Sequence, residues 1–376
     1  MPRIRELDGL RAVAALSVFA HHAISFPALA RFTSTGWIGV DLFFVISGYL
    51  ITTILLGMRG APHYFKNFYM RRTLRIFPPY YLFLLICFVA VLFSRSYHPS
   101  GRLWSSFLFY ATSLIVILPW YSGALASVPN PASAIEVTWS LSIEELFYLL
   151  WAPGVRFLRK GALILVVAAV ILLAPVLRWY LHSLQCREYF FFPSRMDSLA
   201  FGAALALIWD SGRRWRISGW YVIAGLAATA SALLLIDNPR GSLWFSVFGY
   251  TLIAVTMALV VAFVLGRAGS GSLACRALRS KVLVRVGTVS YMFYLLHLFV
   301  IRMSTDWFAN LSGFHWADRG FTLMASLAMT MLLAELSWRY FESPILKLKS
   351  RFSSGRTREA VTTGVLAEAA SAAVDA

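Results

Sequence analysis

Two ionisable residues near the amino terminus have the spacing expected of a site inside a membrane. Arg11 and His22 lie in a largely apolar stretch for which we predict a helix over 10–30. At about 100° and ~1.5 Å per residue, both side chains fall on one face, about 16 Å apart. This places Arg11 at a membrane surface and His22 near mid-depth. Histidine is the usual general base near neutral pH, although a hydrogen bond between helices would also account for it.

A second candidate group is basic. Arg71, Arg72 and Arg75 lie just before Pro78, in a segment that we expect to be a loop on the inner side of the membrane. Arg72 and Arg75 are about one helical turn apart, so their guanidinium groups can converge on a polyanion such as a pyrophosphate. Topology anchoring and contact with lipid phosphates would explain the same residues.

One acidic candidate lies near the outer end of the second apolar segment. Asp41 is flanked by Gly39 and Gly48, which permit close helix contact and could bring its carboxylate toward His22. A carboxylate that still reaches water at the membrane interface is the alternative.

The second acidic candidate is Glu144, at the start of a later apolar segment, where an acid is costly unless it has a role. The adjacent Glu145 is explained by a capping box with Ser142. Near the inner end of the last span, the i, i+4 spacing of Glu335 and Arg339 predicts a structural ion pair.

Four further polar residues lie toward the outer ends of two later segments. Arg195 and Asp197 open one of them and could simply pair with each other. Tyr294 and His297 are one turn apart in the other, where an interhelical hydrogen bond would also explain the histidine. Together with the arginines inside, this pattern suits a protein that takes an anionic molecule from the cytoplasm and acts on a polar one from the far side.

The elements that must position these residues are membrane helices. The 376 residues are 59% hydrophobic and 14% charged, with a mean hydropathy of +0.69. A soluble domain of this size cannot bury so much apolar surface. Long apolar segments recur along the chain, at 10–30, 36–57, 77–94, 104–120, 139–155, 162–180, 196–209, 218–236, 243–265, 282–303 and 321–341.

Charge decides the predicted topology. The net charge of +17 does not indicate nucleic-acid binding, because the basic residues form short clusters between apolar segments. Most of them fall inside if both termini are cytoplasmic, which requires about ten spans and one re-entrant or interfacial segment at 104–120 or 139–155. We therefore expect an all-α membrane domain over 1–350 and a disordered cytoplasmic tail over 351–376. The three scattered cysteines suggest neither a disulfide framework nor a metal site.

A series of motifs, taken in order, resembles the acyltransferase-3 family of integral membrane acyltransferases. The motifs are Asp8-Gly-Leu-Arg11 with His22, Gly39-Val-Asp41-Leu-Phe-Phe-Val-Ile-Ser47-Gly48-Tyr49, Arg72-x-x-Arg75-Ile-Phe-Pro78, Thr138-Trp-Ser-Leu-Ser-Ile-Glu144-Glu145, Arg195-Met-Asp197, Ser290-Tyr-x-x-Tyr294-Leu-Leu-His297 and Phe341-Glu342-x-Pro344. They cover almost the whole chain.

The resemblance implies a bacterial inner-membrane O-acyltransferase, most often an acetyltransferase, that moves an acyl group from cytoplasmic acyl-CoA to a sugar of a surface glycan or glycosylated small molecule. It implies that His22 is the general base or acyl carrier, with Asp41 or Glu144 orienting its imidazole. The implied acyl-CoA ligands are Arg11, Arg71, Arg72 and Arg75, and the implied acceptor ligands are Arg195, Asp197, Tyr294 and His297.

Acetyl-CoA or another acyl-CoA would be a substrate, and we expect no metal and no permanently bound cofactor. The expected partners are the glycan acceptor and membrane lipids. Some members of the family carry an extracytoplasmic hydrolase-like domain; we expect none here, so glycan-assembly proteins are further candidate partners. A transporter or flippase for an anionic or glycan substrate stays open as the alternative, and a sensor or assembly scaffold is a weaker one.

Overall fold

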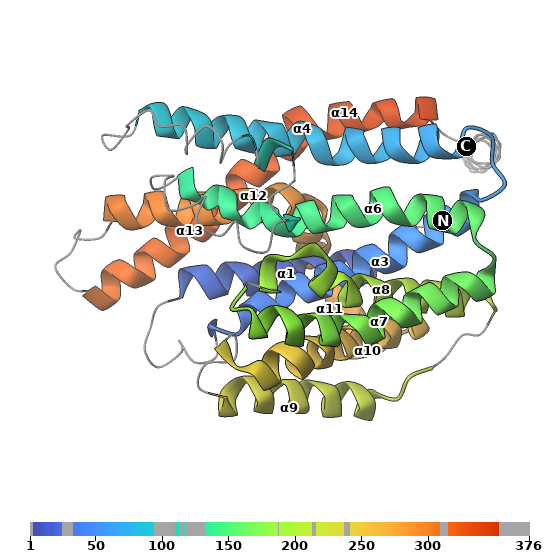
Figure 1. The fold of residues 1–376 in the computed structure, drawn as a ribbon. Helices are drawn as coiled ribbons and strands as arrows, with labels where there is room; N and C mark the ends of the chain where they lie inside the picture. The colour runs from blue at the N-terminus through green and yellow to red at the C-terminus, as the bar shows by residue number, and fades with distance from the viewer. Residues whose placement is uncertain are drawn as a thin grey trace.

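The described residues of this chain form a bundle of helices and contain no strand (Figure 1). The computed structural model describes residues 3–24, 33–93, 108, 110–112, 116–117, 132–186, 188–212, 216–236, 241–308 and 315–352. Its α-helices are α1 (Arg5–Ala23), α3 (Gly39–Met58), α4 (Tyr64–Leu92), α6 (Trp139–Phe157), α7 (Lys160–Ser183), α8 (Phe192–Asp210), α9 (Gly219–Leu235), α10 (Tyr250–Gly266), α11 (Leu273–Leu278), α12 (Lys281–Phe308), α13 (His315–Ser337) and α14 (Ser343–Lys347).

Shorter helical turns extend several of these elements. The 3₁₀ turns are η1 (Gly36–Ile38), η4 (Ala132–Thr138), η5 (Glu188–Phe190) and η9 (Leu348–Phe352), and the π-helical turns are η7 (Phe245–Gly249) and η8 (Trp338–Glu342). The two π-helical turns join their flanking helices without a break, so the chain from α13 to η9 runs as one long helical segment.

The prediction of an all-helical membrane protein is confirmed. Within the described residues, six segments are long and apolar enough to span a membrane: Gly36–Met58, Tyr64–Leu92, Lys160–Ser183, Phe245–Gly266, Lys281–Thr305 and Gly320–Phe352. The predicted total of about ten spans stays a prediction. Segment 104–120 lies mostly outside the described residues, as does the tail from residue 353, whereas 139–155 is a continuous helix led by η4.

Two predicted boundaries are wrong in ways that matter for the site. α1 begins earlier and ends earlier than the predicted 10–30, so His22 is the second-last residue of this helix and not a residue half-way along it. The segment with Arg71, Arg72 and Arg75 is not a loop, because α4 is helical from Tyr64 through two prolines. Proline lacks the backbone donor and usually breaks a helix, which is why the sequence suggested an end there.

Small residues allow the central helices to approach closely. α3 packs along α8, and a Cβ built on Gly48 would lie 2.0 Å from the carbonyl oxygen of Leu199. Gly202 on α8 meets α3 in the same way. α1 packs against α12, where Gly287 faces the backbone of Asp8. These contacts fix α1, α3, α8 and α12 as the centre of the bundle.

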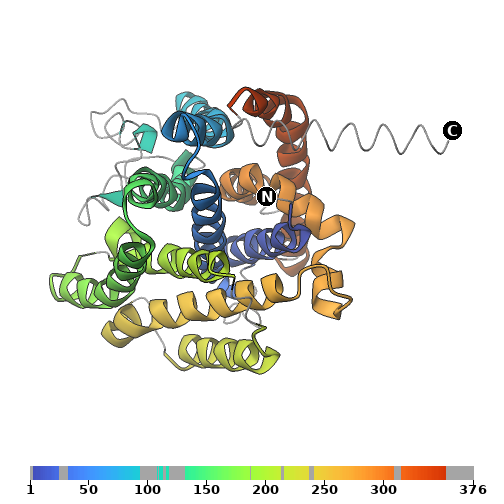
Figure 2. The same ribbon diagram turned by 90° about the vertical axis from the view of Figure 1, so that its right-hand side faces the viewer.

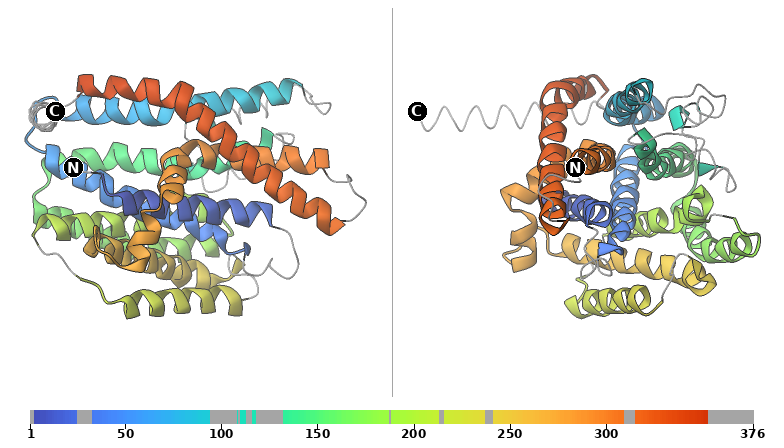
Figure 3. Two further views of the ribbon diagram at one scale, coloured as in Figure 1. Left: turned by 180° about the vertical axis from the view of Figure 1, so that it is seen from behind. Right: turned by 90° about the vertical axis from the view of Figure 1, so that its left-hand side faces the viewer.

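The remaining helices surround this centre. α9 lies at the periphery against α10, as Figure 2 shows. The carboxy-terminal segment from α14 to η9 lies beside the first half of α4, at the end of the bundle where α1 begins (Figures 1 and 3). The amino-terminal and carboxy-terminal described segments are therefore brought to one end of the molecule.

Candidate active site

A large cavity opens at the end of the bundle where α1 begins. Its volume is about 1050 Å³. Six basic side chains line it, and they come from the amino terminus, from α4 and from η9: Arg3, Arg11, Arg71, Arg72, Arg75 and Lys349. Arg11, Arg71, Arg72 and Arg75 were predicted as one site, and the structure brings them to the same cavity, to which Arg3 and Lys349 are additions.

The two acids that line this cavity are already engaged. Asp8 lies 2.6 Å from Arg3 Nε and 3.7 Å from Arg11 Nη1. Glu342 Oε1 accepts a hydrogen bond from the Ser337 hydroxyl at 3.1 Å. In the described part of the chain, no carboxylate oxygen lies within 4.0 Å of the charged nitrogens of the other four lining cations, which are Arg71, Arg72, Arg75 and Lys349. The cavity therefore has a surplus of positive charge.

A narrower chamber leads from the basic cavity into the bundle. Its volume is about 80 Å³, and it shares Arg11, Leu50, Arg72, Arg75 and Tyr291 with the larger cavity. Most of its other walls are apolar or aromatic, and they include Val40, Phe43, Phe44, Ile51 and Leu141. An anionic group held by the arginines would thus have an apolar extension directly behind it.

Glu144 supplies the carboxylate of this chamber. Its Oε1 accepts from the Ser47 hydroxyl at 2.9 Å, and its Oε2 accepts from the Tyr148 hydroxyl at 2.6 Å. Arg11 and Arg72 interact with it electrostatically. The acid is therefore fixed between the arginines and two hydroxyl groups, and its hydrogen bonds join α3 to α6.

The predicted capping box next to Glu144 is not formed. α6 begins at Trp139, so Ser142 lies inside its first turn, where its hydroxyl donates to the Thr138 carbonyl at 3.2 Å. A serine that bonds the carbonyl four residues back cannot also cap the helix. The early helix start comes from η4, whose turns lead directly into α6.

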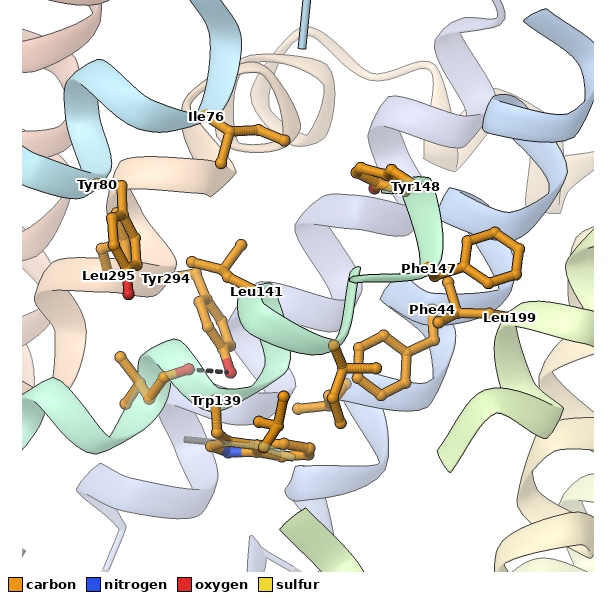
Figure 4. Close-up of a cluster of buried hydrophobic side chains, with 14 of the residues drawn as sticks. Phe44, Ile76, Tyr80, Trp139, Leu141, Phe147, Tyr148, Leu199, Tyr294 and Leu295 are labelled. Carbon is orange, nitrogen blue, oxygen red and sulfur yellow. Dashed lines mark hydrogen bonds between the residues drawn. The ribbon is translucent and has the colours of Figure 1, made fainter. Parts of the chain in front are cut away.

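Tyr294 from α12 closes the chamber on the side away from the basic cavity. Its hydroxyl lies 2.8 Å from the Ser140 hydroxyl and donates to the Val137 carbonyl at 3.2 Å. Figure 4 shows its ring pointing toward the start of α6, near Leu141. The tyrosine thus connects the chamber to the segment that leads into α6.

Behind Tyr294, a row of imidazoles reaches the end of α1. His297 Nδ1 lies 2.5 Å from the Tyr294 carbonyl oxygen, and His297 Nε2 lies 3.2 Å from His22 Nδ1. His297 is 1% exposed, whereas His22 is exposed. The His21 ring packs edge-on against His22, with 4.8 Å between ring centroids.

The helix-face argument had suggested that His22 and the arginines line one cavity, and the structure does not place them so. Neither the basic cavity nor the chamber includes His22 among its lining residues. α1 contains both residues, with Arg11 in its first half beside the basic cavity and His22 one residue from its end, about three turns away. Tyr294, which lines the chamber, and His297, which contacts both Tyr294 and His22, connect the chamber to His22.

The predicted outer residues Arg195 and Asp197 do not pair with each other. Arg195 Nη2 lies 2.7 Å from Asp41 Oδ1, and Arg178 Nη1 lies 2.9 Å from Asp197 Oδ2. All four side chains are 0% exposed. Ser198 donates a further hydrogen bond to Asp41 Oδ1 at 2.7 Å. The close packing of α3 on α8 therefore brings Asp41 to Arg195, not to His22.

Sequence reasoning missed Arg178. It lies within an apolar helix, α7, and its neighbours there gave no motif. The available signal was its charge, because a buried arginine within an apolar helix needs a partner. The Arg195 guanidinium in the adjoining pair lies over the Tyr250 ring at 4.6 Å and the Tyr189 ring at 5.0 Å. These contacts make the cluster part of the interior framework.

The His22 imidazole contacts the side chains of His297 and His21, and neither predicted acid bonds to it. Asp41 Oδ1 is bonded to α8, its Oδ2 has no hydrogen-bond partner among the described residues, and both Glu144 oxygens accept from hydroxyl groups. The predicted ion pair of Glu335 and Arg339 is also not formed, because Glu335 forms a bidentate ion pair with Arg285 of α12.

Comparison with known proteins shows which family this chain belongs to. The chain is 32% identical over 389 residues to the putative peptidoglycan O-acetyltransferase YrhL of Bacillus subtilis, covering 96% of this chain and 58% of that relative. It is 29% identical over 366 residues to the peptidoglycan O-acetyltransferase OatA of Listeria monocytogenes, covering 92% of this chain and 56% of that relative. It is 28% identical over 360 residues to the O-acetyltransferase OatA of Staphylococcus aureus, with 91% and 57% covered.

The chain thus spans somewhat more than half the length of these curated relatives. No solved structure is similar to it. The Acyl_transf_3 family model, described as an acyltransferase domain, matches residues 4–335. That range holds every residue of the chamber and all the basic residues of the cavity except Arg3 and Lys349. The protein therefore belongs to the acyltransferase-3 family.

Proposed function

We propose that this protein is a multi-pass O-acetyltransferase of the bacterial inner membrane that transfers an acetyl group from acyl-CoA to a hydroxyl of cell-wall glycan. The relatives described as peptidoglycan O-acetyltransferases support the acceptor class. In this proposal the basic cavity faces the cytoplasm, with both termini on that side. Coenzyme A is a substrate in this scheme and not a resident cofactor.

The observation that carries the proposal is the joining of a basic cavity to an apolar chamber. Coenzyme A is a polyanion at its nucleotide end and a flexible, uncharged arm at its thioester end. Arg71, Arg72 and Arg75 offer guanidinium groups, which bind phosphate oxygens well because of their planar forks. The cavity of about 1050 Å³ has the size of a ligand pocket, whereas the chamber of about 80 Å³ admits only a narrow group.

The contacts of the two histidines determine which nitrogen of His22 carries the lone pair that a base needs. A carbonyl oxygen only accepts hydrogen bonds, so the contact with Tyr294 O requires the proton of neutral His297 on Nδ1. His297 Nε2 is then an acceptor for His22 Nδ1–H. The Val18 carbonyl, 3.0 Å from His22 Nδ1, requires the proton on the same atom. The lone pair of His22 is therefore on Nε2.

This tautomer is the one a general base requires. We propose that His22 Nε2 takes the proton of the acceptor hydroxyl while the hydroxyl oxygen attacks the thioester carbonyl. The C–S bond breaks, the ester forms, and the proton passes to the departing thiolate of coenzyme A. His297 holds the imidazole in position, a role that the sequence had suggested for Asp41 or Glu144. In this scheme Arg195 and Asp197 do not contact the acceptor, and their role is to stabilise the interior packing of the helices.

The proposal is tested with the purified full chain reconstituted in proteoliposomes. The assay measures transfer of label from acetyl-CoA to peptidoglycan fragments. We expect His22→Ala to lower kcat by at least about 100-fold, the usual contribution of a general base. His63→Asn is the matched control, because His63 lines neither cavity and its backbone, at φ 54°, suits asparagine. Full activity of His22→Ala would refute the base assignment.

The same proteoliposomes distinguish the rival function. A transporter or flippase would move its substrate without acyl-CoA and without forming an ester. Accumulation of glycan in the lumen that does not depend on acetyl-CoA, together with absence of labelled product, would favour transport and overturn the acetyltransferase proposal.

A further inference from the structure

The carboxy-terminal helical segment beyond the family match adds a cation to the basic cavity. The family model ends at residue 335, whereas η9 carries Lys349 at the cavity wall. η9 packs against α4, the helix that carries the three arginines of the cavity (Figure 3). Leu346, one turn earlier, lines the same cavity. This segment therefore forms part of the cavity wall.

The position of Lys349 is electrostatically unfavourable without a ligand. Arg71, Arg72 and Arg75 all repel its ammonium group. Among the described residues no carboxylate lies within ion-pair distance of it, and Glu342, the acid on its own segment, accepts from Ser337. Like charges gathered in a half-buried cavity raise the free energy of the folded state, and a bound polyanion removes that cost.

The neighbouring lysine of the same segment is different. Lys347 is exposed and does not line the cavity, although it is only two residues away. Helical geometry explains this contrast, because residues two apart point to different sides of a helix. The segment thus presents one lysine to the cavity and the other away from it.

We propose that Lys349 is a ligand for a phosphate group of the acyl-CoA donor. This inference rests on the proposed function and assigns to the donor site a residue outside the matched family domain. The lysine adds a compact point charge beside the planar arginine forks. The nucleotide end of the donor, which carries several phosphates, is the part that fits a wall of four cations without carboxylate partners.

The test compares Lys349→Gln with Lys347→Gln in the reconstituted full chain. One charge-assisted contact corresponds to about a tenfold change in affinity. We expect Lys349→Gln to raise the KM for acetyl-CoA about tenfold with kcat within twofold. Lys347→Gln should keep both values within twofold, and Lys349→Arg should restore most of the affinity. The KM of the Gln variant should also rise less steeply with salt, because one screened contact is gone.

Two further arms separate the possible sources of the phosphate. Acetyl-dephospho-CoA lacks the 3′-phosphate, so an unchanged KM ratio between variant and wild type with this donor assigns Lys349 to the pyrophosphate. A ratio that falls to one assigns it to the 3′-phosphate. If Lys349 instead binds a lipid headgroup, its substitution would alter activity only in vesicles that contain phosphatidylglycerol, and this result would overturn the inference.

Failure of this inference differs from failure of the proposed function. If the wild-type protein transfers label from acetyl-CoA and Lys349→Gln behaves like Lys347→Gln, only the role of Lys349 is refuted. If the wild-type protein neither binds nor uses acetyl-CoA, the proposed function fails, and the assignment of Lys349 to a donor phosphate fails with it.

Discussion

The buried pair of Asp41 and Arg195 gives the sharpest test of how charge holds this bundle together. Its N–O distance is 2.7 Å and both side chains are 0% exposed. Lys160 and Asp210 form a pair of the same length, 2.7 Å, with exposed fractions of 38% and 45%. The two pairs therefore share one N–O distance and differ strongly in burial, which makes one a control for the other.

Asp41→Asn removes the carboxylate charge and leaves the Arg195 guanidinium in the interior without its charged partner. Arg195 Nε and Nη1 already have no hydrogen-bond partner among the described residues, so the neutral amide of Asp41→Asn cannot be offset by the other nitrogens. Breaking a buried pair from one side costs about 3–5 kcal/mol. Asp210→Asn should cost at most about 1 kcal/mol, the range for exposed pairs.

The measurement is the free energy of unfolding in mixed detergent micelles, followed by tryptophan fluorescence. The double variant Asp41→Asn with Arg195→Met should recover most of the loss, because it removes the unpaired charge as well as its partner. The reasoning is refuted if Asp41→Asn and Asp210→Asn cost the same. It is also refuted if the double variant loses the sum of both single effects.

Two other predictions concern packing and positioning. Gly48→Ala should destabilise the protein by about 1–3 kcal/mol, because its Cβ would meet a backbone carbonyl of α8. Gly57→Ala in the same helix meets no atom within 4 Å and should be neutral or stabilising by up to about 1 kcal/mol. Equal losses of the free energy of unfolding in the two variants would contradict this. Arg302→Gln should speed amide exchange in 132–138, which Arg302 holds by two side-chain hydrogen bonds, while Arg285→Gln should leave exchange there unchanged. Unaltered exchange in the first variant would show that the arginine does not hold the segment.

Hydrophobicity identified the helices because a helix that faces lipid must be apolar. It misplaced their ends where the end faces protein. α1 begins at Arg5, and its first turns carry Glu6 and Asp8, which are buried against other parts of the chain. Glu6 accepts from the backbone amide of Gly269, far away in the sequence. Such partners are supplied by tertiary structure, so no local pattern could have placed this boundary.

Local spacing was similarly limited for ion pairs. Arg195 and Asp197 are close in sequence, yet each pairs with a residue of another helix. Glu335 likewise takes a partner on α12 in place of the residue one turn away. Neighbours on one helix gain only about 0.2–0.5 kcal/mol from such a pair, so tertiary packing easily selects a different partner. The types of residue were informative, whereas their pairing was not.

The basic site was easier to predict, because several cations gathered at one end of the bundle need an anion more than they need particular neighbours. The relation of His22 to that site was predicted less well, because helix geometry gives the spacing of two residues along α1 and does not show which side chains of other helices line a cavity between them. The resulting separation constrains the proposed mechanism. If the nucleotide end stays with the arginines, only the acyl arm can extend through the chamber toward Tyr294. Substitutions in the basic cavity should then change the KM of the donor alone, and substitutions around His22 should change turnover and the KM of the acceptor.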